Sequence, residues 1–155
     1  MKIRRITPGD LDVISQMTFE FETHLHSLIK KKPRVNLAKI KSAYRKAGLG
    51  LNDVCGGFIA EEKRGAAGFA LCYCGYRSDQ NGKILDVPDI FVRQGARGTG
   101  VGKNLMAELR KHARSLGCIR LELSVWNHNP RALKFYLDMG LRPIGDEILL
   151  RWKIA

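Results

Sequence analysis

A glycine-rich segment, residues 91–103, has the residue types and spacing of a site for phosphate groups. An apolar, strand-like stretch runs into glycines at 95, 98, 100 and 102, and a helical pattern follows. Glycine lets the backbone approach a ligand closely and take up dihedral angles that side chains disfavour. The first N–H groups of a helix have no internal partner, so they can bind an anion. The segment therefore predicts an anion site at a strand-to-helix junction.

Two common phosphate-binding motifs do not fit this segment. A Walker A loop requires glycine at 97 and Ser or Thr after Lys103, but the chain has Arg97 and Asn104 there. A dinucleotide fingerprint, Gly-x-Gly-x-x-Gly, meets Lys103 if it starts at Gly98 and Leu105 if it starts at Gly100. A glycine-rich turn without a ligand stays open as an alternative.

Two elements of the chain resemble the GNAT superfamily of N-acetyltransferases. The family signature, Arg/Gln-x-x-Gly-x-Gly/Ala, is matched by Arg97, Gly100 and Gly102. The second element, Asn-x-x-Ala followed by Phe-Tyr and a helix-ending Gly, is matched by Asn129, Ala132, Phe135, Tyr136 and Gly140. The resemblance covers residues 66–153 closely, whereas the first 55 residues fit only as the family's variable strand and two helices. Both elements in this order make the signal specific.

The resemblance implies acetyl-CoA as co-substrate. Its pyrophosphate would be cradled by the backbone of Arg97, Gly98, Thr99, Gly100, Val101, Gly102 and Lys103. On the strand containing Ile90, Phe91 and Val92, the backbone of Ile90 and Val92 would pair with the pantetheine arm. This arrangement requires that strand to splay from the one over residues 119–126.

The same resemblance assigns two downstream side chains. Asn129 would bond the pantetheine or support its strand end, and Tyr136 would donate a proton to the leaving thiolate. Each has an ordinary alternative: Asn129 could simply cap a helix that begins with Pro130, and Tyr136 could be a core tyrosine. The positive charges of Arg93, Arg97 and Lys103 would favour a phosphate in either case.

The general base is less well defined. Gly68-Phe69-Ala70, Gly82-Lys83 and the strand end resemble the diamine (spermidine/spermine-type) acetyltransferases, which carry Glu-Asp where this chain has Pro88 and Asp89. Asp89 is therefore the expected catalytic carboxylate, with a solvated or capping role as its alternative. Asp86 and Glu122 are possible substitutes.

Acidic residues near an amine-binding mouth are predicted at Glu20, Glu22 and Asp53. They would have to overcome the net charge of +12, which gives little attraction to a polyamine. His24 and His26, on the first helix, are expected at the surface.

The elements that position these residues are predicted in the order β, α, α, β, β, β, α, β, α, β. A strand over residues 2–6 precedes helical spacing over 11–28 and 37–48, and strands follow at 57–61, 66–76 and 84–92. A hairpin turn with Asn-Gly at its tip joins the last two, and Pro88 implies an edge or a bulge. Closing strands are expected over 141–154. We predict a single-domain, GNAT-like α/β fold (1–155) with a mixed, mostly antiparallel sheet, helices on both faces and a splayed central strand pair.

Length and composition limit the classes of protein to which the chain could belong. The 155 residues suit one domain, and 45% are hydrophobic. The four cysteines, Cys55, Cys72, Cys74 and Cys118, lack metal-ligand spacing, so we expect reduced thiols and no metal. We also expect a cytoplasmic protein without a membrane span.

The sequence therefore predicts an N-acetyltransferase that transfers acetyl from acetyl-CoA to a primary amine of a small molecule or peptide. The alternatives are acetylation of a protein N-terminus or lysine, and a non-catalytic CoA- or nucleic-acid-binding module. Nucleic acid is not expected as a partner, although the basic charge leaves it open, and a homodimer is possible.

Overall fold

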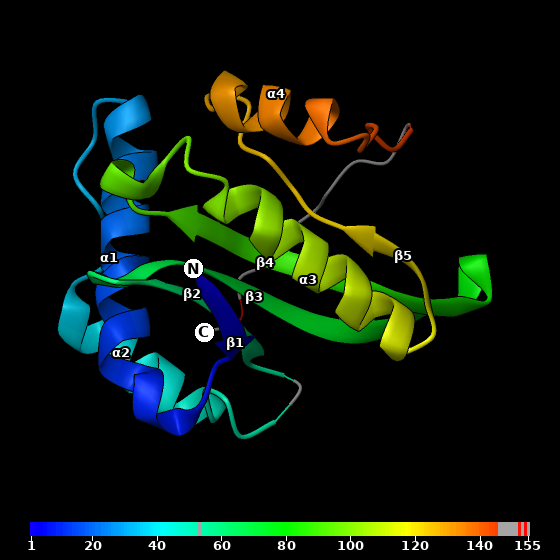
Figure 1. Ribbon diagram of the computed structural model, residues 1–155, viewed down its shortest axis with the longest axis horizontal. Coiled ribbons are helices and arrows are strands. Elements are labelled where there is room, and N and C mark those ends of the chain that lie inside the picture. The colour runs from blue at the N-terminus through cyan, green and yellow to red at the C-terminus, as the bar shows by residue number, and fades with distance from the viewer. Residues whose placement is uncertain (53, 146–151, 153, 155) are drawn as a thin grey trace. The chain divides into compact units, whose positions relative to one another are not determined.

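The computed structural model describes residues 1–52, 54–145, 152 and 154. Two compact units are present, Met1–Ser124 and Val125–Ala155. In the part of the chain that the structure describes, the first unit holds the sheet and three α-helices, and the second holds one α-helix (Figure 1). Among the described residues, no helix has the length and apolarity needed to cross a membrane.

The first unit is built on a five-stranded sheet in the order β1-β2-β3-β4-β5. The strands are β1 (Lys2–Arg5), β2 (Gly56–Glu62), β3 (Gly65–Arg77), β4 (Gly82–Val92) and β5 (Cys118–Glu122). The first four pair antiparallel, and β5 pairs parallel to β4. The predicted mixed, mostly antiparallel sheet is confirmed.

Helices cover both faces of this sheet, as the sequence predicted. On one face, α1 (Leu11–Leu28) packs with α2 (Leu37–Ala47). On the other, α3 (Val101–Ser115) lies across the strands (Figure 1). Successive side chains of β2 point to opposite faces of the sheet. The ring centroids of Phe58 and of His112 on α3 are 5.4 Å apart, whereas the neighbouring Ile59 lies in the core under α1.

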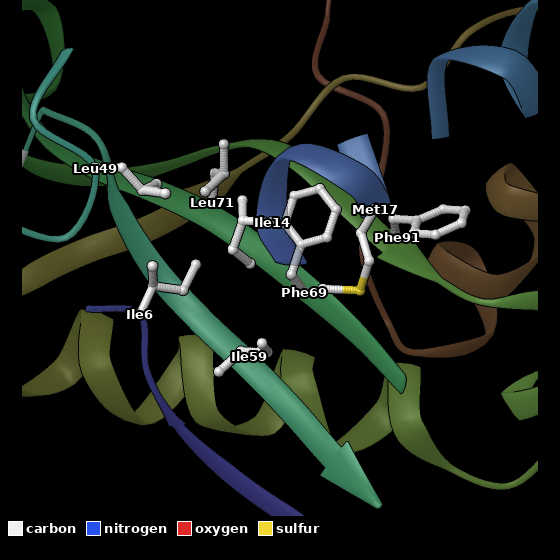
Figure 2. Close-up of a cluster of buried hydrophobic side chains, with 8 residues drawn as sticks. All are labelled: Ile6, Ile14, Met17, Leu49, Ile59, Phe69, Leu71 and Phe91. Carbon is white, nitrogen blue, oxygen red and sulfur yellow. The ribbon is translucent and has the colours of Figure 1, made fainter. Parts of the chain in front are cut away.

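That core is formed mainly by α1 and the three central strands (Figure 2). Its buried members are Ile6, Ile14, Met17, Leu49, Ile59, Phe69, Leu71 and Phe91. Figure 2 shows the α1 side chains Ile14 and Met17 beside the ring of Phe69. Helical spacing on α1 and alternation on β3 therefore face the same interior.

The start of α1 is fixed to the sheet by a buried carboxylate. A short 3-10 turn, Pro8–Asp10, precedes the helix, where the sequence predicted that the helix itself began. Asp10 accepts hydrogen bonds from the Thr7 N–H and hydroxyl at 2.8 and 2.9 Å, and two from Arg4 at 2.8 Å each. The Arg4 hydrogen bonds lower the pKa of Asp10 to about 2, with smaller lowering effects from Thr7. β1 is thereby tied to the first turn of α1.

One strand prediction was wrong and one lies partly outside the described residues. The strand expected over 119–126 ends at Glu122, because β4 stops pairing with it there. Residues 141–145 form no strand, and the remainder of the predicted closing strands, 146–151 and 153, lies outside the described residues, as does Asp53. The second unit contains α4 (Pro130–Asp138).

Candidate functional site

The central feature of the site is the place where β4 and β5 part. Their parallel pairing runs from Lys83–Cys118 to Asp86–Glu122. Beyond Asp86, β4 continues to Val92 with β3 on one side only, among the described strands. The predicted open side of β4 is present, but it arises where β5 itself ends at Glu122 and not from two continuing strands that splay.

A bulge at Pro88 accompanies the separation. Leu71 of β3 pairs with Asp89, whereas Tyr73 pairs with Asp86, so Val87 and Pro88 together face one residue of β3. An extra residue bends a strand and increases its twist. Proline also lacks the N–H that a ladder needs. The bulge predicted for Pro88 is confirmed, but β4 lies inside the sheet and is not an edge strand.

The free side of β4 presents the main chain of Ile90 and Val92. The N–H of Arg93 donates to Ala67 O of β3 at 2.9 Å. Because hydrogen-bonding direction alternates along an antiparallel pair, Phe91 also faces β3, and Ile90 and Val92 face the open side. The side chain of Phe91 lies in the core, and its ring centroid is 5.6 Å from that of Phe21.

The glycine-rich loop brings the N-terminus of α3 to this same end of β4. Gly98 and Gly100 have φ values of +84° and +95°, which favour glycine. The first intrahelical bond is donated by Asn104 N to Gly100 O at 3.0 Å. The N–H groups of Val101, Gly102 and Lys103 precede it and point out of the helix end, where no side chain of the described residues caps the helix. The loop can therefore accept an anion.

Gly68 of β3 permits the close approach of α3. A Cβ at this position would lie 2.6 Å from Phe91 O and 3.3 Å from Val101 Cγ1. A side chain would force both β4 and the first turn of α3 outward. Gly68, which the sequence suggested only as part of a subgroup pattern, thus sets the spacing between the loop and the end of β4.

The two arginines near the loop have different roles. Arg97 Nε donates to Val92 O at 3.0 Å, so this side chain lies on the open side of β4. Arg93 instead forms a bidentate ion pair with Glu20 of α1, with both N–O distances at 2.9 Å. It also donates to Ala66 O at 2.9 Å. The predictions that Arg93 attracts phosphate and that Glu20 attracts an amine are corrected, because each neutralises the other.

Asp89 lies on the α1 face of β4. It shares that face with Leu71 and Phe91 of the core. Burial, and then the charge of Glu22, raise the pKa of the Asp89 carboxyl from its usual 3.8 to about 6. No described residue donates a hydrogen bond to it or forms an ion pair with it. Asp89 is thus a desolvated carboxylate that titrates just below neutral pH.

The groups around Asp89 come from α1, α2 and the segment before β2. The hydroxyls of Thr18 and Tyr44 lie 2.7 Å apart. Burial raises the pKa of the Tyr44 phenol above its usual range, and the charges of Asp89 and Glu22 add to it. Burial and the Asp89 charge also raise the pKa of the Cys55 thiol. The Tyr44 phenol and the Cys55 thiol stay protonated at pH 7, so they add no negative charge beside Asp89.

The other candidate carboxylates have partners. Asp86 accepts a hydrogen bond from the Tyr73 hydroxyl at 3.0 Å, and Glu122 is paired with Arg77 and Arg120. These contacts favour Asp89 as the base. His26, expected at the surface, is half-buried, with Nδ1 2.8 Å from Glu22 O.

In the second unit, Asn129 is the N-cap of α4 and Tyr136 lies on that helix. Asn129 Oδ1 accepts from Ala132 N at 3.2 Å and Pro130 follows it, so the capping role is present. The Tyr136 ring contacts Phe135 edge to face at 5.2 Å between centroids. Burial raises the pKa of the Tyr136 phenol to about 12, so it is protonated at neutral pH.

The open side of β4, the loop and the α3 terminus agree with a comparison to known families. The sequence matches the acetyltransferase (GNAT) family over residues 22–141. The chain belongs to this family. The resemblance at Arg97–Gly102 and Asn129–Gly140 is confirmed at the family level, and the family match crosses from the first unit into the second.

Individual relatives of this GNAT chain are distant. An uncharacterized N-acetyltransferase of Methanocaldococcus jannaschii is 26% identical over 151 residues, which cover 97% of this chain and 63% of the relative. Thialysine N-epsilon-acetyltransferase of Bos taurus is 31% identical over 79 residues, covering 51% and 46%. The chain thus spans less than two thirds of either relative's length.

A solved structure establishes the same fold. Aminoglycoside N-acetyltransferase AAC(6')-Iy in complex with CoA superposes with a TM-score of 0.76 at 19% identity, covering 99% of this chain and 95% of that one. The GNAT fold of the chain is therefore established by structure as well as by sequence.

Proposed function

We propose that this chain transfers the acetyl group of acetyl-CoA to a primary amine by direct attack, with Asp89 as the general base. The observation that carries the proposal is the desolvated Asp89 at the point where β4 and β5 separate. A lysine-like ammonium has a pKa of about 10.4, so only about one molecule in two thousand is neutral near pH 7. This costs roughly 4–5 kcal/mol, part of which a nearby base recovers.

Different segments of the chain would bind different parts of acetyl-CoA. The N–H groups at 101–103 and the loop from Arg97 suit the pyrophosphate, because they are directed outward at a helix N-terminus. The main chain of Ile90 and Val92 suits the pantetheine arm as an added strand, with Phe91 supporting it from the core. Asn129 and Tyr136 are assigned by the family motif, Asn129 to the pantetheine and Tyr136 to the leaving thiolate.

The proposed reaction balances with these groups. The amine lone pair attacks the thioester carbonyl carbon, and the proton that nitrogen loses passes to Asp89, directly or through water. A backbone N–H near Val92 stabilises the oxyanion. The C–S bond then breaks, and Tyr136 protonates the thiolate sulfur. Asp89 acts alone because Pro88 stands where the diamine acetyltransferases, which this strand end resembles, carry a glutamate.

We further propose that residues 1–155 act as a single catalytic domain, because the family match crosses the boundary between the two units. The acceptor is a primary amine on a small molecule or peptide. The relative named for thialysine makes that amino acid the first compound to try. Cytoplasmic location and homodimer formation stay predictions.

The decisive experiment follows thiol release from acetyl-CoA across a panel of primary amines. We expect release that depends on the added amine and that yields the acetylated amine by mass spectrometry. Absence of acetyl-CoA binding by calorimetry, together with no release for any amine, would contradict the proposal.

A further inference from the structure

A strongly basic segment, residues 30–46, comprises the connection after α1 and nearly all of α2. We call it the basic segment. Its charged residues are Lys30, Lys31, Lys32, Arg34, Lys39, Lys41, Arg45 and Lys46. The whole chain has 27 Lys and Arg against 15 Asp and Glu, yet none of the acidic residues lies between 23 and 52. The positive charge is therefore concentrated here.

These side chains are directed to solvent and are largely unneutralised. Lys41 pairs with Asp12, and the other seven are exposed. Within the described ranges, no carboxylate lies within ion-pair distance of those seven. Solvated surfaces normally intersperse both signs of charge, so a one-sign surface of this kind favours an anionic partner.

Apolar side chains accompany the charges. Leu28, Val35 and Leu37 are 37%, 37% and 39% exposed. Interfaces with proteins combine such apolar contacts with a polar rim. The mixture suits a peptide better than a phosphate backbone, which is bound mainly through its charges.

The fold places the inner face of α2 near Asp89 through Tyr44, and the charged face of the helix lies outside it. α2 turns Ile40 and Tyr44 inward, with Tyr44 packed against the core that contains Phe91 and hydrogen-bonded to Thr18 of α1. Its opposite face carries Lys39, Arg45 and Lys46. The tip of β4 ends beside α1, and the connection between α1 and α2 runs along that helix (Figure 1).

The α1–α2 side of the proposed site thus carries both signs of charge: negative at the desolvated Asp89 and the half-buried Glu22, and positive on the exposed basic segment. A free polyamine suits only the inner charges and is repelled by the outer ones. An ammonium with acidic neighbours suits both. We propose, on the basis of the acetyltransferase function proposed above, that the basic segment docks acidic residues flanking the reacting amine of a peptide acceptor.

The test compares two peptides of equal length with one lysine amine each, flanked by Glu in one and by Gln in the other. We expect kcat/KM, from thiol release, to be about tenfold or more higher for the Glu peptide at low salt. The preference should shrink at about 0.5 M salt, because exposed charges are then screened. This comparison needs no variant.

Charge removal locates the effect. The variants K30Q/K31Q/K32Q and K39Q/R45Q/K46Q should lower kcat/KM for the Glu peptide toward that for the Gln peptide. The control R110Q/K111Q/R114Q removes three charges from exposed positions of α3 and should keep the preference. Thermal unfolding of each variant confirms that it is folded.

The contrary outcomes are distinguishable. Thialysine acetylation with equal kcat/KM for the two peptides would overturn the docking surface and leave the proposed function intact. Loss of the preference for the Glu peptide in the α3 control variant would overturn the assignment of the docking surface to the basic segment. Tight, salt-sensitive binding of duplex DNA without a peptide preference would assign the basic segment to nucleic acid. No acetylation of any amine would overturn the function and the docking surface together.

Discussion

The desolvation of Asp89 would serve its proposed role as general base at the expense of stability. Its carboxyl has a pKa of about 6 because burial disfavours the charged form. At pH 7 the group is mostly ionised and can accept a proton, which a general base requires. The same ionised, desolvated group destabilises the folded state, because unfolding returns it to water.

Replacement of Asp89 by Asn should therefore lower activity and raise stability. We expect kcat/KM to fall by about 10²–10⁴-fold. The wild-type kcat/KM should decrease as pH falls through about 6, since the base becomes protonated. The free energy of unfolding should rise by up to about 3 kcal/mol above pH 6, and this gain should vanish below about pH 4, where Asp89 is protonated in both folded and unfolded states.

The matched control is Asp86→Asn, which makes the same change on the same strand where the carboxylate already has the Tyr73 hydroxyl as a partner. Activity that survives in Asp89→Asn and is lost in Asp86→Asn would move the base to Asp86.

Tyr136 gives the second residue-scale prediction. Burial raises the pKa of its phenol to about 12, so it carries a proton at neutral pH. We expect Tyr136→Phe to lower kcat by about 10²-fold and to leave the acetyl-CoA dissociation constant unchanged. Tyr76→Phe makes the same change at a side chain that is 67% exposed, and its rate should equal that of the wild type. Equal rates for both variants would exclude Tyr136 as the acid.

At the scale of elements, Gly68 couples the sheet to α3. Gly68→Ala would place a Cβ 2.6 Å from Phe91 O, which is backbone and cannot rotate away. We expect a loss of about 1–3 kcal/mol in urea unfolding, together with weaker acetyl-CoA binding as the loop shifts. Gly75→Ala, in the same strand but with no atom within 4 Å of the new Cβ, should not destabilise the protein. Equal midpoints for the two variants would argue against the close approach.

Residue patterns in the sequence predicted which helices and strands are present better than they predicted where each one ends. Alternation over 119–126 is regular, so the sequence could not show that β5 stops at Glu122. That limit is set by the bulge at Pro88 on the neighbouring strand, which is a property of the pair. Likewise, Arg93 lies close to the glycine-rich loop in sequence, but its partner Glu20 is on α1 and becomes visible only in the fold.

At the scale of the whole molecule, the sequence shows the amount of charge and the fold shows where it acts. The basic segment is readable as a run of lysine and arginine, whereas the exposure of its charged face depends on α2 packing against α1. The family motif could likewise be recognised from glycine spacing, because the required N–H groups belong to the backbone and follow from local structure. The surroundings of Asp89 are made by side chains from distant segments, so sequence spacing alone left the proposed acceptor site open.

Acetyl-CoA binding should stabilise the entire chain by mass action. For a dissociation constant in the micromolar range, ligand at about 100 times that constant contributes about 2.7 kcal/mol. For a chain of this length, that corresponds to a rise in Tm of roughly 5–10 °C. Adenosine, which lacks the pyrophosphate, should give no comparable shift. Gly100→Ala, which disturbs a φ of +95° at the start of α3, should lose most of the acetyl-CoA shift measured from its own baseline. An equal Tm shift with adenosine would show that the affinity comes from contacts to the adenine base and not from the pyrophosphate at the helix N-terminus.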